Sequence, residues 1–400
     1  PASPLAPLTV TFFDSDNVRL ELLRQRAYNY RWAVHPADVI PLTAADPDFA
    51  VAPPITEALV RHVTDGYHSY GPPRGLPEFR EAIAAWYTRT KLSPVDVAHV
   101  LPVNSAAGGL FIAARTILGP GDNAIIPDPV DFLFRRSIEA AGATVRTCPL
   151  PEHSAEFDLD SLTSLIDDRT RAIFICNPHN PRGRMLSAAH LLAVVTLAER
   201  HGLWVVSDEI WADISYATPF VSILDRALPV YPKTIVVSGL SKNFALAAMR
   251  IGYLIARTDE ITTRLFDASQ HATTAAGIPV LSQVAGTAAL TACDAWLGEF
   301  RAHLAARRAQ TLAFIAEMPF LAPVDTNATY LAFPRLVGVR DTADAFVARV
   351  LAESRVALVP GGRDWFEAGS EGHLRICFAT SEDILKVAFD RITCALPKLT

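Results

Sequence analysis

Short apolar runs that alternate with helix-length amphipathic stretches constrain the fold of this chain more than any other feature. The runs are rich in β-branched residues and lie at 123–129, 144–150, 171–178, 203–209, 234–240 and 250–256. Because each run is apolar on both faces, we predict strands of a largely parallel sheet that helices cover on both sides. The stretches 130–142 and 187–202 are expected to be such helices, and Gly202 follows a basic last turn of the second. This alternation is typical of the α/β class.

The pattern changes near residue 290. A long helical stretch at 293–318 is followed by short apolar runs at 329–335, 357–361 and 374–379. We therefore predict a large domain over residues 46–288 with a mostly parallel sheet, and a smaller α+β domain over residues 289–400. The N-terminal segment, residues 1–45, is expected to fold back and join the smaller domain.

Composition and charge exclude several classes of protein. The chain has 400 residues, of which 50% are hydrophobic and 20% charged, and a formal net charge of −6 without a basic run. Nucleic acid and anionic membranes are therefore not expected as partners. No apolar stretch approaches the length of a membrane span, and the first ten residues, PASPLAPLTV, lack a signal-peptide pattern. The five cysteines are scattered, so we expect reduced core residues in a cytoplasmic protein, and the histidines show no metal-ligand spacing.

Polar residues follow three of the predicted strands at the same end. Asn180 comes after one strand, Asp208 after the next, and Ser241 and Lys242 after a third. Singly, each is as readily explained by a helix cap or a turn. Ligands of open α/β sheets bind beyond the carboxyl ends of the strands, so together these residues predict a site. Arg250 follows Lys242 by eight positions among small and apolar residues, which indicates two cations directed into one pocket.

Four motifs identify a family. The stretches NPHNPRGR (177–184), SDEIWADI (207–214), SGLSKNFALAAMRIGY (238–253) and HLRICFA (373–379) resemble, in order and spacing, the fold-type I pyridoxal-phosphate enzymes of the aminotransferase class I/II family. The stretches YGPPRGLPEFREAIAAWY (70–87) and GPGDNAIIPDP (119–129) are similar to that family too. The resemblance covers nearly the whole chain. It implies the aspartate aminotransferase-like PLP-transferase fold and pyridoxal 5'-phosphate as the cofactor.

The resemblance also implies roles around the cofactor ring. Lys242 resembles the lysine that forms a Schiff base with the cofactor aldehyde, which requires a lowered pKa. Asp208 would ion-pair with the pyridine nitrogen and keep it protonated, so that the ring accepts electrons. Asn180 would donate to the ring 3-oxygen and lie beside the substrate.

Further roles concern the phosphate and the substrate. Arg250 resembles the phosphate clamp, next to Ser241 and to the backbone amides at the start of a helix, those of Ser105, Ala106 and Ala107. Tyr70 resembles the tyrosine that reaches the phosphate of a neighbouring subunit, which implies a homodimer with shared sites. Arg375 lies where the family binds the α-carboxylate of an amino-acid substrate, and Tyr330 is a second expected substrate contact.

Three positions depart from the family pattern. Where an aromatic residue would stack on the ring, the sequence has Asp131 followed by Phe132, and either could face the cofactor. If Asp131 faces the site, its carboxyl group could act as a catalytic acid. Trp211 replaces a tyrosine; its indole N–H can donate to the 3-oxygen but cannot accept a proton. Gly239 replaces a serine that touches the phosphate, so that contact is expected to be lost.

The reaction is less constrained than the cofactor, because one cofactor supports several reactions. The stretches 176–184, 207–214, ADPDF (45–49) and TYLAF (329–333) look like the cystathionine β-lyase or C–S lyase branch, although that branch usually has histidine in place of Trp211. We therefore predict β- (or γ-) elimination or replacement, in specialised metabolism. The run Arg-Ile-Gly-Tyr at 250–253 is more typical of aminotransferases, so the alternative is amino-group transfer between an amino acid and a 2-oxo acid. A third, remote alternative is a regulatory binding protein that retains the fold.

Overall fold

A large mixed sheet forms the centre of the computed structural model, which describes residues 12–399. Its seven strands lie in the order β2-β8-β7-β6-β5-β3-β4. All neighbours pair in parallel except β8, which is antiparallel to both β2 and β7. The bounds are β2 Val100–Val103, β3 Asn123–Asp128, β4 Thr144–Pro149, β5 Thr170–Cys176, β6 Trp204–Asp208, β7 Thr234–Gly239 and β8 Gly252–Ile255. The α/β class and all six strands predicted in this region are confirmed.

Alternate residues of each central strand face two separate cores. Val205 and Val236 pack in the core under α3 (Pro77–Lys91) and α7 (Ala188–His201), whereas Val206 and Val237 pack in the core under α4 (Ala106–Ile117) and α5 (Leu133–Ala140). Because successive side chains of a strand point to opposite faces, a strand covered on both sides must be apolar throughout. The expectation of burial on both faces was wrong for β4: it is an edge strand, and most of its residues are partly or fully exposed.

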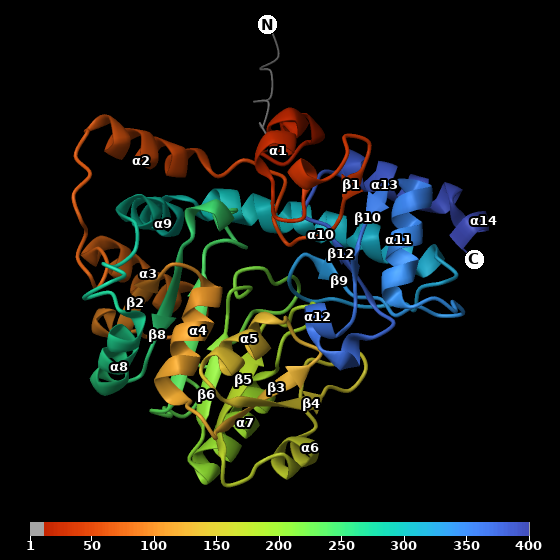
Figure 1. The fold of residues 1–400 in the computed structure, drawn as a ribbon. Helices are drawn as coiled ribbons and strands as arrows, with labels where there is room; N and C mark the ends of the chain where they lie inside the picture. Colours follow the sequence, from red (N-terminus) through yellow and green to blue (C-terminus); the bar gives the residue numbers. More distant parts are fainter. Residues whose placement is uncertain (1–11, 400) are drawn as a thin grey trace, which may run out of the picture.

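The helices around the sheet begin and end where the sequence indicates. The Ser187 hydroxyl caps α7 by accepting from the His190 amide, and Gly202 ends the helix at φ 66°. The other helices of this region are α2 Pro53–Thr64, α6 Leu159–Ser164 and α8 Asp259–Ser269. Figure 1 shows α4, α5 and α8 in front of the sheet.

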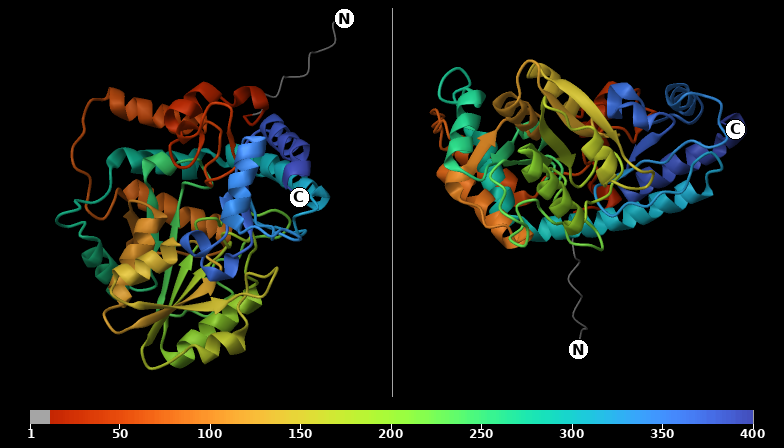
Figure 2. Two further views of the ribbon diagram at one scale, coloured as in Figure 1. Left: turned by 45° about the vertical axis from the view of Figure 1, so that its right-hand side comes forward. Right: turned by 90° about the horizontal axis from the view of Figure 1, so that it is seen from below.

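A second part of the molecule is built from the two ends of the described chain. β11 (Val359–Pro360), β12 (Leu374–Cys377) and β9 (Leu331–Ala332) form a three-stranded antiparallel sheet. β1 (Ile40–Pro41) pairs in parallel with β10 (Val356–Ala357), so the N-terminal segment lies beside the C-terminal elements, as both views of Figure 2 show. The helices here are α1 Leu20–Arg26, α11 Ala343–Ser354, α12 Arg363–Phe366, α13 Glu382–Cys394 and α14 Leu396–Leu399.

One long helix connects the two parts. α10 (Asp294–Glu317) follows α9 (Val280–Ala292) and crosses to the C-terminal helices, where it packs on α13 (Figure 1). Within residues 12–399, no helix is long and apolar enough to cross a membrane. The cysteines are free, four of them buried and Cys394 exposed. The expectation about a signal peptide concerns the first ten residues, which lie outside the described range.

Candidate active site

Most of the predicted site residues surround one cavity of about 480 Å³. It lies where the carboxyl ends of β5, β6 and β7 meet the part of the molecule built from the chain ends. Both the large sheet and the C-terminal part contribute to its wall. The predicted residues that line it are Ser105, Ala106, Ala107, Asp131, Phe132, Asn180, Asp208, Trp211, Ser241, Lys242, Arg250 and Arg375.

Two predicted site residues lie outside this lining. The Tyr330 side chain is fully buried behind Trp211, with its ring 4.6 Å from the indole and its hydroxyl donating to the Ala45 carbonyl at 3.3 Å. Its placement therefore supports packing rather than contact with a substrate. Tyr70 is 93% exposed on the outer surface, beside the segment that leads into α9. Its contact with a neighbouring subunit remains a prediction.

Lys242 follows β7 and points into the cavity without a carboxylate partner. Its Nζ donates to the Ala45 carbonyl at 2.7 Å and lies 5.5 Å from the centre of the Trp211 ring. Burial lowers the pKa of this ammonium below the usual lysine value, which the nearby Asp46 carboxylate opposes and Arg375 reinforces. The neutral amine is therefore present at a lower pH than for an exposed lysine.

Asp208 is the last residue of β6, and its carboxylate is buried at the floor of the cavity. Oδ1 accepts a hydrogen bond from the Ile210 amide at 3.0 Å. Among residues 12–399, no lysine or arginine forms an ion pair with it. Burial raises the pKa of Asp208 to about 7. A cation in the cavity beside this group would restore its charge.

The start of α4 forms a second, positively polarised part of the wall. Ser105 caps the helix by accepting from the Gly108 amide at 3.0 Å, and the following amides of Ala106 and Ala107 have no partner within the helix. β8 passes directly behind: a Cβ on Gly252 would lie 2.6 Å from the Ala106 nitrogen. Arg250 lines the same cavity. Helix amides and a guanidinium together favour an anion with two charges.

A chain of polar contacts crosses the opposite wall. The Arg375 guanidinium is buried, donates to the Asn180 Oδ1 and to the Thr43 carbonyl at 3.2 Å each, and leaves its Nε without a partner. Burial lowers its pKa. The Asn180 Nδ2 in turn donates to the Asp131 Oδ2 at 2.8 Å. Arg375 therefore remains a buried cation without an ion-pair partner among the described residues, which favours a carboxylate ligand.

Asp131 and Phe132 both line the cavity. Asp131 is held through both oxygens, because Oδ1 accepts from the Leu133 amide at 3.1 Å. Burial raises its pKa, and these N–H donors oppose that shift. Phe132 donates its amide to the Trp365 carbonyl, and the two rings meet edge to face at 6.3 Å.

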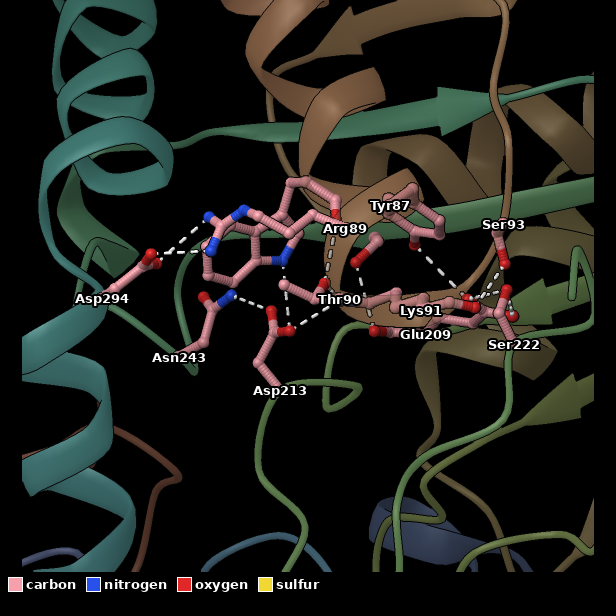
Figure 3. A network of polar contacts seen from close by, with 12 residues as sticks. Tyr87, Arg89, Thr90, Lys91, Ser93, Glu209, Asp213, Ser222, Asn243 and Asp294 are labelled. Atoms are coloured by element: carbon pink, nitrogen blue, oxygen red, sulfur yellow. Dashed lines mark hydrogen bonds and ion pairs between the residues drawn. The ribbon is translucent and has the colours of Figure 1, made fainter.

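A separate buried network holds the loop after β6 (Figure 3). Asp213 accepts from Lys91 at 2.6 Å, from the Trp86 indole at 3.1 Å and from Asn243, the neighbour of Lys242, at 2.6 Å. Glu209, next to Asp208, accepts from the Ser222 hydroxyl at 2.8 Å. These contacts fix the backbone on both sides of the cavity residues, although no part of the network lines the cavity.

Sequence reasoning missed the wall that comes from the N-terminal segment and from α11 and α12. Tyr30, Thr43 and Ala45 line the cavity, and a buried ion pair of Arg31 with Asp48, at 2.5 Å, anchors this segment. The motif at 45–49 predicts a reaction class and not a place in the cavity wall. Its contact with the cavity depends on long-range packing, which the local pattern does not contain.

The fold and this set of groups define a pyridoxal-phosphate-dependent enzyme that acts on amino acids. The chain belongs to the aminotransferase class I and II family, which matches residues 37–392. An aspartate aminotransferase from Pyrococcus horikoshii is 29% identical over 364 residues, 90% of this chain and 91% of the relative. One from Thermotoga maritima is 31% identical over 359 residues, 89% of this chain and 90% of the relative. A solved structure, of the aromatic aminotransferase from Pyrococcus horikoshii, has a TM-score of 0.84 at 29% identity and covers 91% of this chain and 98% of that one.

These comparisons confirm the family, the fold and the cofactor predicted from the motifs. They support the aminotransferase alternative better than the elimination that we predicted first, because the relatives are aminotransferases by name. Membership of the C–S lyase branch has no support among them.

Proposed function

We propose that this protein is an aminotransferase that moves an amino group between an amino acid and a 2-oxo acid. The observation that carries this proposal is the presence, in one cavity, of a lysine with a lowered pKa and a buried arginine without an ion-pair partner. An amino-acid substrate has an amino group that can lie near Lys242 and a carboxylate that can pair with Arg375. The names of the relatives support transfer over elimination. They do not agree on the side chain, since one is named for aspartate and another for aromatic amino acids.

The residues of the cavity fit the cofactor. The α4 amides with Ser105, Ser241 and Arg250 would hold the phosphate, and the otherwise unpaired Asp208 carboxylate would face the protonated ring nitrogen. Lys242 would hold the aldehyde carbon covalently through Nζ. When bound, the cofactor supplies an electron sink for the bond electrons of the substrate α-carbon.

Lys242 is also the group proposed to move the substrate proton. Burial lowers the pKa of its ammonium, so the neutral amine forms at a lower pH than in an exposed lysine, and Nζ lies 5.5 Å from the centre of the Trp211 ring. The indole cannot take up a proton, so proton transfer falls to the lysine. Asp131 is a weaker proton donor in this arrangement, because both its oxygens already accept N–H groups.

Arg375 and Asn180 are proposed to orient the amino acid. The guanidinium can offer the Nε that lacks a partner, and an adjacent N–H, to the α-carboxylate. The Asn180 side chain fixes the guanidinium from one side. Holding the carboxylate here leaves the amino group and the α-carbon free to face Lys242.

We further propose that the protein is a homodimer. We also propose that residues 46–288 form the large domain, and that residues 1–45 join residues 289–400 in the smaller one. The 93% exposure of Tyr70 supports a contact with a second subunit, because a large aromatic side chain is rarely left so exposed. The pairing of β1 with β10 supports assignment of the N-terminal segment to the smaller domain.

The direct test is a panel of amino acids offered to the cofactor-loaded protein together with a second 2-oxo acid. We expect formation of the amino acid that corresponds to the added oxo acid, without release of ammonia. Lys242→Ala is the control and should show no formation. Release of ammonia in proportion to the substrate consumed would overturn the proposal.

A further inference from the structure

The outer wall of the cavity is apolar and largely aromatic. It is assembled from three separate segments: Tyr30 near the N-terminus, Val347 and Leu351 on α11, and Trp365 and Phe366 at the end of α12. The Trp365 ring is central to this wall, because it meets the Tyr30 ring edge to face at 5.4 Å and the Phe132 ring at 6.3 Å. Such a surface favours contact with an apolar or aromatic group, since aromatic pairs prefer this edge-to-face geometry.

Every lysine and arginine side chain of the cavity lining already has a proposed role that does not involve the side chain of the substrate. Lys242, Arg250 and Arg375 are the lysine and arginine residues among the described residues that line it. The proposed function uses them for the cofactor aldehyde, the phosphate and the α-carboxylate. His35 also lines the cavity, but burial lowers its pKa, so the ring is neutral at neutral pH.

Within the described residues of one chain, a second carboxylate on the substrate would therefore find no cation of its own in the cavity lining. It would also share the cavity with the Asp131 carboxylate, which accepts from the Asn180 Nδ2 at 2.8 Å, while the Asn180 Oδ1 accepts from Arg375. Burial of an unpaired carboxylate beside another one is strongly unfavourable. Burial of an aromatic side chain against Trp365 is favourable, because it removes apolar surface from water.

We propose that the cavity selects an amino acid with a large apolar or aromatic side chain and discriminates against amino acids with a side-chain carboxylate, and that Trp365 determines this specificity. This inference rests on the aminotransferase function proposed above, and names its substrate class.

Binding of unreactive carboxylates tests the selection without any turnover. 3-Phenylpropanoate and succinate both carry a carboxylate for Arg375 but no amino group. Their dissociation constants for the cofactor-loaded protein can be measured from the change in its visible absorption. We expect 3-phenylpropanoate to bind at least about tenfold more tightly than succinate, since even one methylene in an apolar pocket contributes about tenfold or more.

Variants of Trp365 locate the effect. Trp365→Ala should weaken 3-phenylpropanoate at least about tenfold and leave succinate within about threefold, while Trp365→Phe should retain most of the preference. Val387→Ala, on the exposed face of α13 and outside the cavity lining, is the control and should change neither constant. Equal or tighter binding of succinate by the native protein would overturn the inference, as would equal weakening of both ligands by Trp365→Ala.

The two proposals fail in different ways. If 3-phenylpropanoate is preferred and phenylalanine is not converted to its oxo acid, the selection stands and the proposed aminotransferase function fails. If aspartate is converted far faster than phenylalanine, the function stands and the proposed selection is overturned.

Discussion

Two groups of buried charges lie on either side of the end of β6, and they differ in their partners. In the cavity, Asp208, Lys242 and Arg375 have no ion-pair partner among the described residues. In the network of Figure 3, Lys91 and Asp213 form an ion pair at 2.6 Å, and both are further bonded or packed. Asp208 and Arg375 are buried, and Lys242 is half-buried. Since charges that are withdrawn from water without an ion-pair partner are costly, a protein that retains three of them in one cavity has a use for them.

The pair of neighbours Asp208 and Glu209 makes the contrast sharpest. Burial raises the pKa of both carboxyl groups to about 7, so this property alone does not separate a functional group from a structural one. Glu209 accepts from the Ser222 hydroxyl at 2.8 Å, the Ile223 amide at 3.0 Å and the Tyr87 hydroxyl at 3.3 Å. Asp208 accepts from a single amide and faces the cavity. The number of partners, rather than the pKa, distinguishes the two roles.

The largest effect is expected from removing the cavity lysine. Lys242→Ala should lower the rate of amino-group transfer by about 10⁴-fold or more, because one residue holds the cofactor and moves the proton. The melting temperature of the cofactor-free protein should stay close to that of the native chain, since Lys242 has no ion pair to lose. Borohydride reduction followed by mass spectrometry should find the cofactor on Lys242 in the native protein. An adduct on another lysine would contradict the assignment.

Removing Lys91, the lysine of the network in Figure 3, should lower the stability of the protein rather than impair the chemistry of the cavity. Lys91→Met leaves the Asp213 carboxylate buried without its cation, which should cost about 3–5 kcal/mol of unfolding free energy. Denaturant unfolding of the cofactor-free protein measures this loss. The folded fraction should still bind the cofactor at Lys242. Loss of activity without loss of stability would show that Lys91 belongs to the catalytic group.

A smaller effect is expected for the carboxylate anchor. Arg375→Lys keeps the positive charge but loses the planar fork, so amino-acid binding should weaken by about 1.5–3 kcal/mol. Cofactor loading should not change, because Arg375 is assigned to the substrate. Titration of the visible spectrum with several amino acids gives both values. Unchanged affinity for all of them would indicate a structural role for Arg375.

The smallest effect is expected in the pH dependence of the unfolding free energy of the cofactor-free protein. Because the folded-state pKa of Asp208 is raised to about 7, the folded state binds a proton that the unfolded state has lost above about pH 4. The contribution of Asp208 to stability is therefore greatest below about pH 4 and is lost as the pH rises through 7. In Asp208→Asn this decrease should be shallower, by on the order of 1 kcal/mol per pH unit between pH 5 and 7. Unfolding curves at several pH values, with an identical pH dependence in variant and native protein, would contradict the pKa assignment.

The sequence predicts much of this molecule, because local patterns are sufficient for local structure. Strands such as β6 and β7 must be apolar throughout when both faces are covered, and Asn180, Asp208 and Lys242 come directly after their strands. The family motifs also predict that Arg250 and Arg375 line the same cavity as these residues, and they do.

The remainder depends on contacts between distant segments. The partial exposure of β4 follows from its place at the sheet edge, which strand composition does not determine. The aromatic wall needs Tyr30 and Trp365, which are more than three hundred residues apart in the sequence and lie together in a fold where β1 pairs with β10. Tyr330 was expected to contact the substrate, but its strand places the ring behind Trp211.

One measurement tests the central claim, that the unpaired charges of the cavity serve amino-group transfer. S-Benzyl-L-cysteine has an aromatic side chain for Trp365 and also a thiol leaving group on its β-carbon. Mixed with cofactor-loaded protein and no oxo acid, it should give about one equivalent of the sulfur-containing 2-oxo acid per protomer, and then stop with the cofactor aminated. Added 2-oxo acid should restart the reaction. Continuous release of benzyl thiol, pyruvate and ammonia would contradict the account and establish elimination instead.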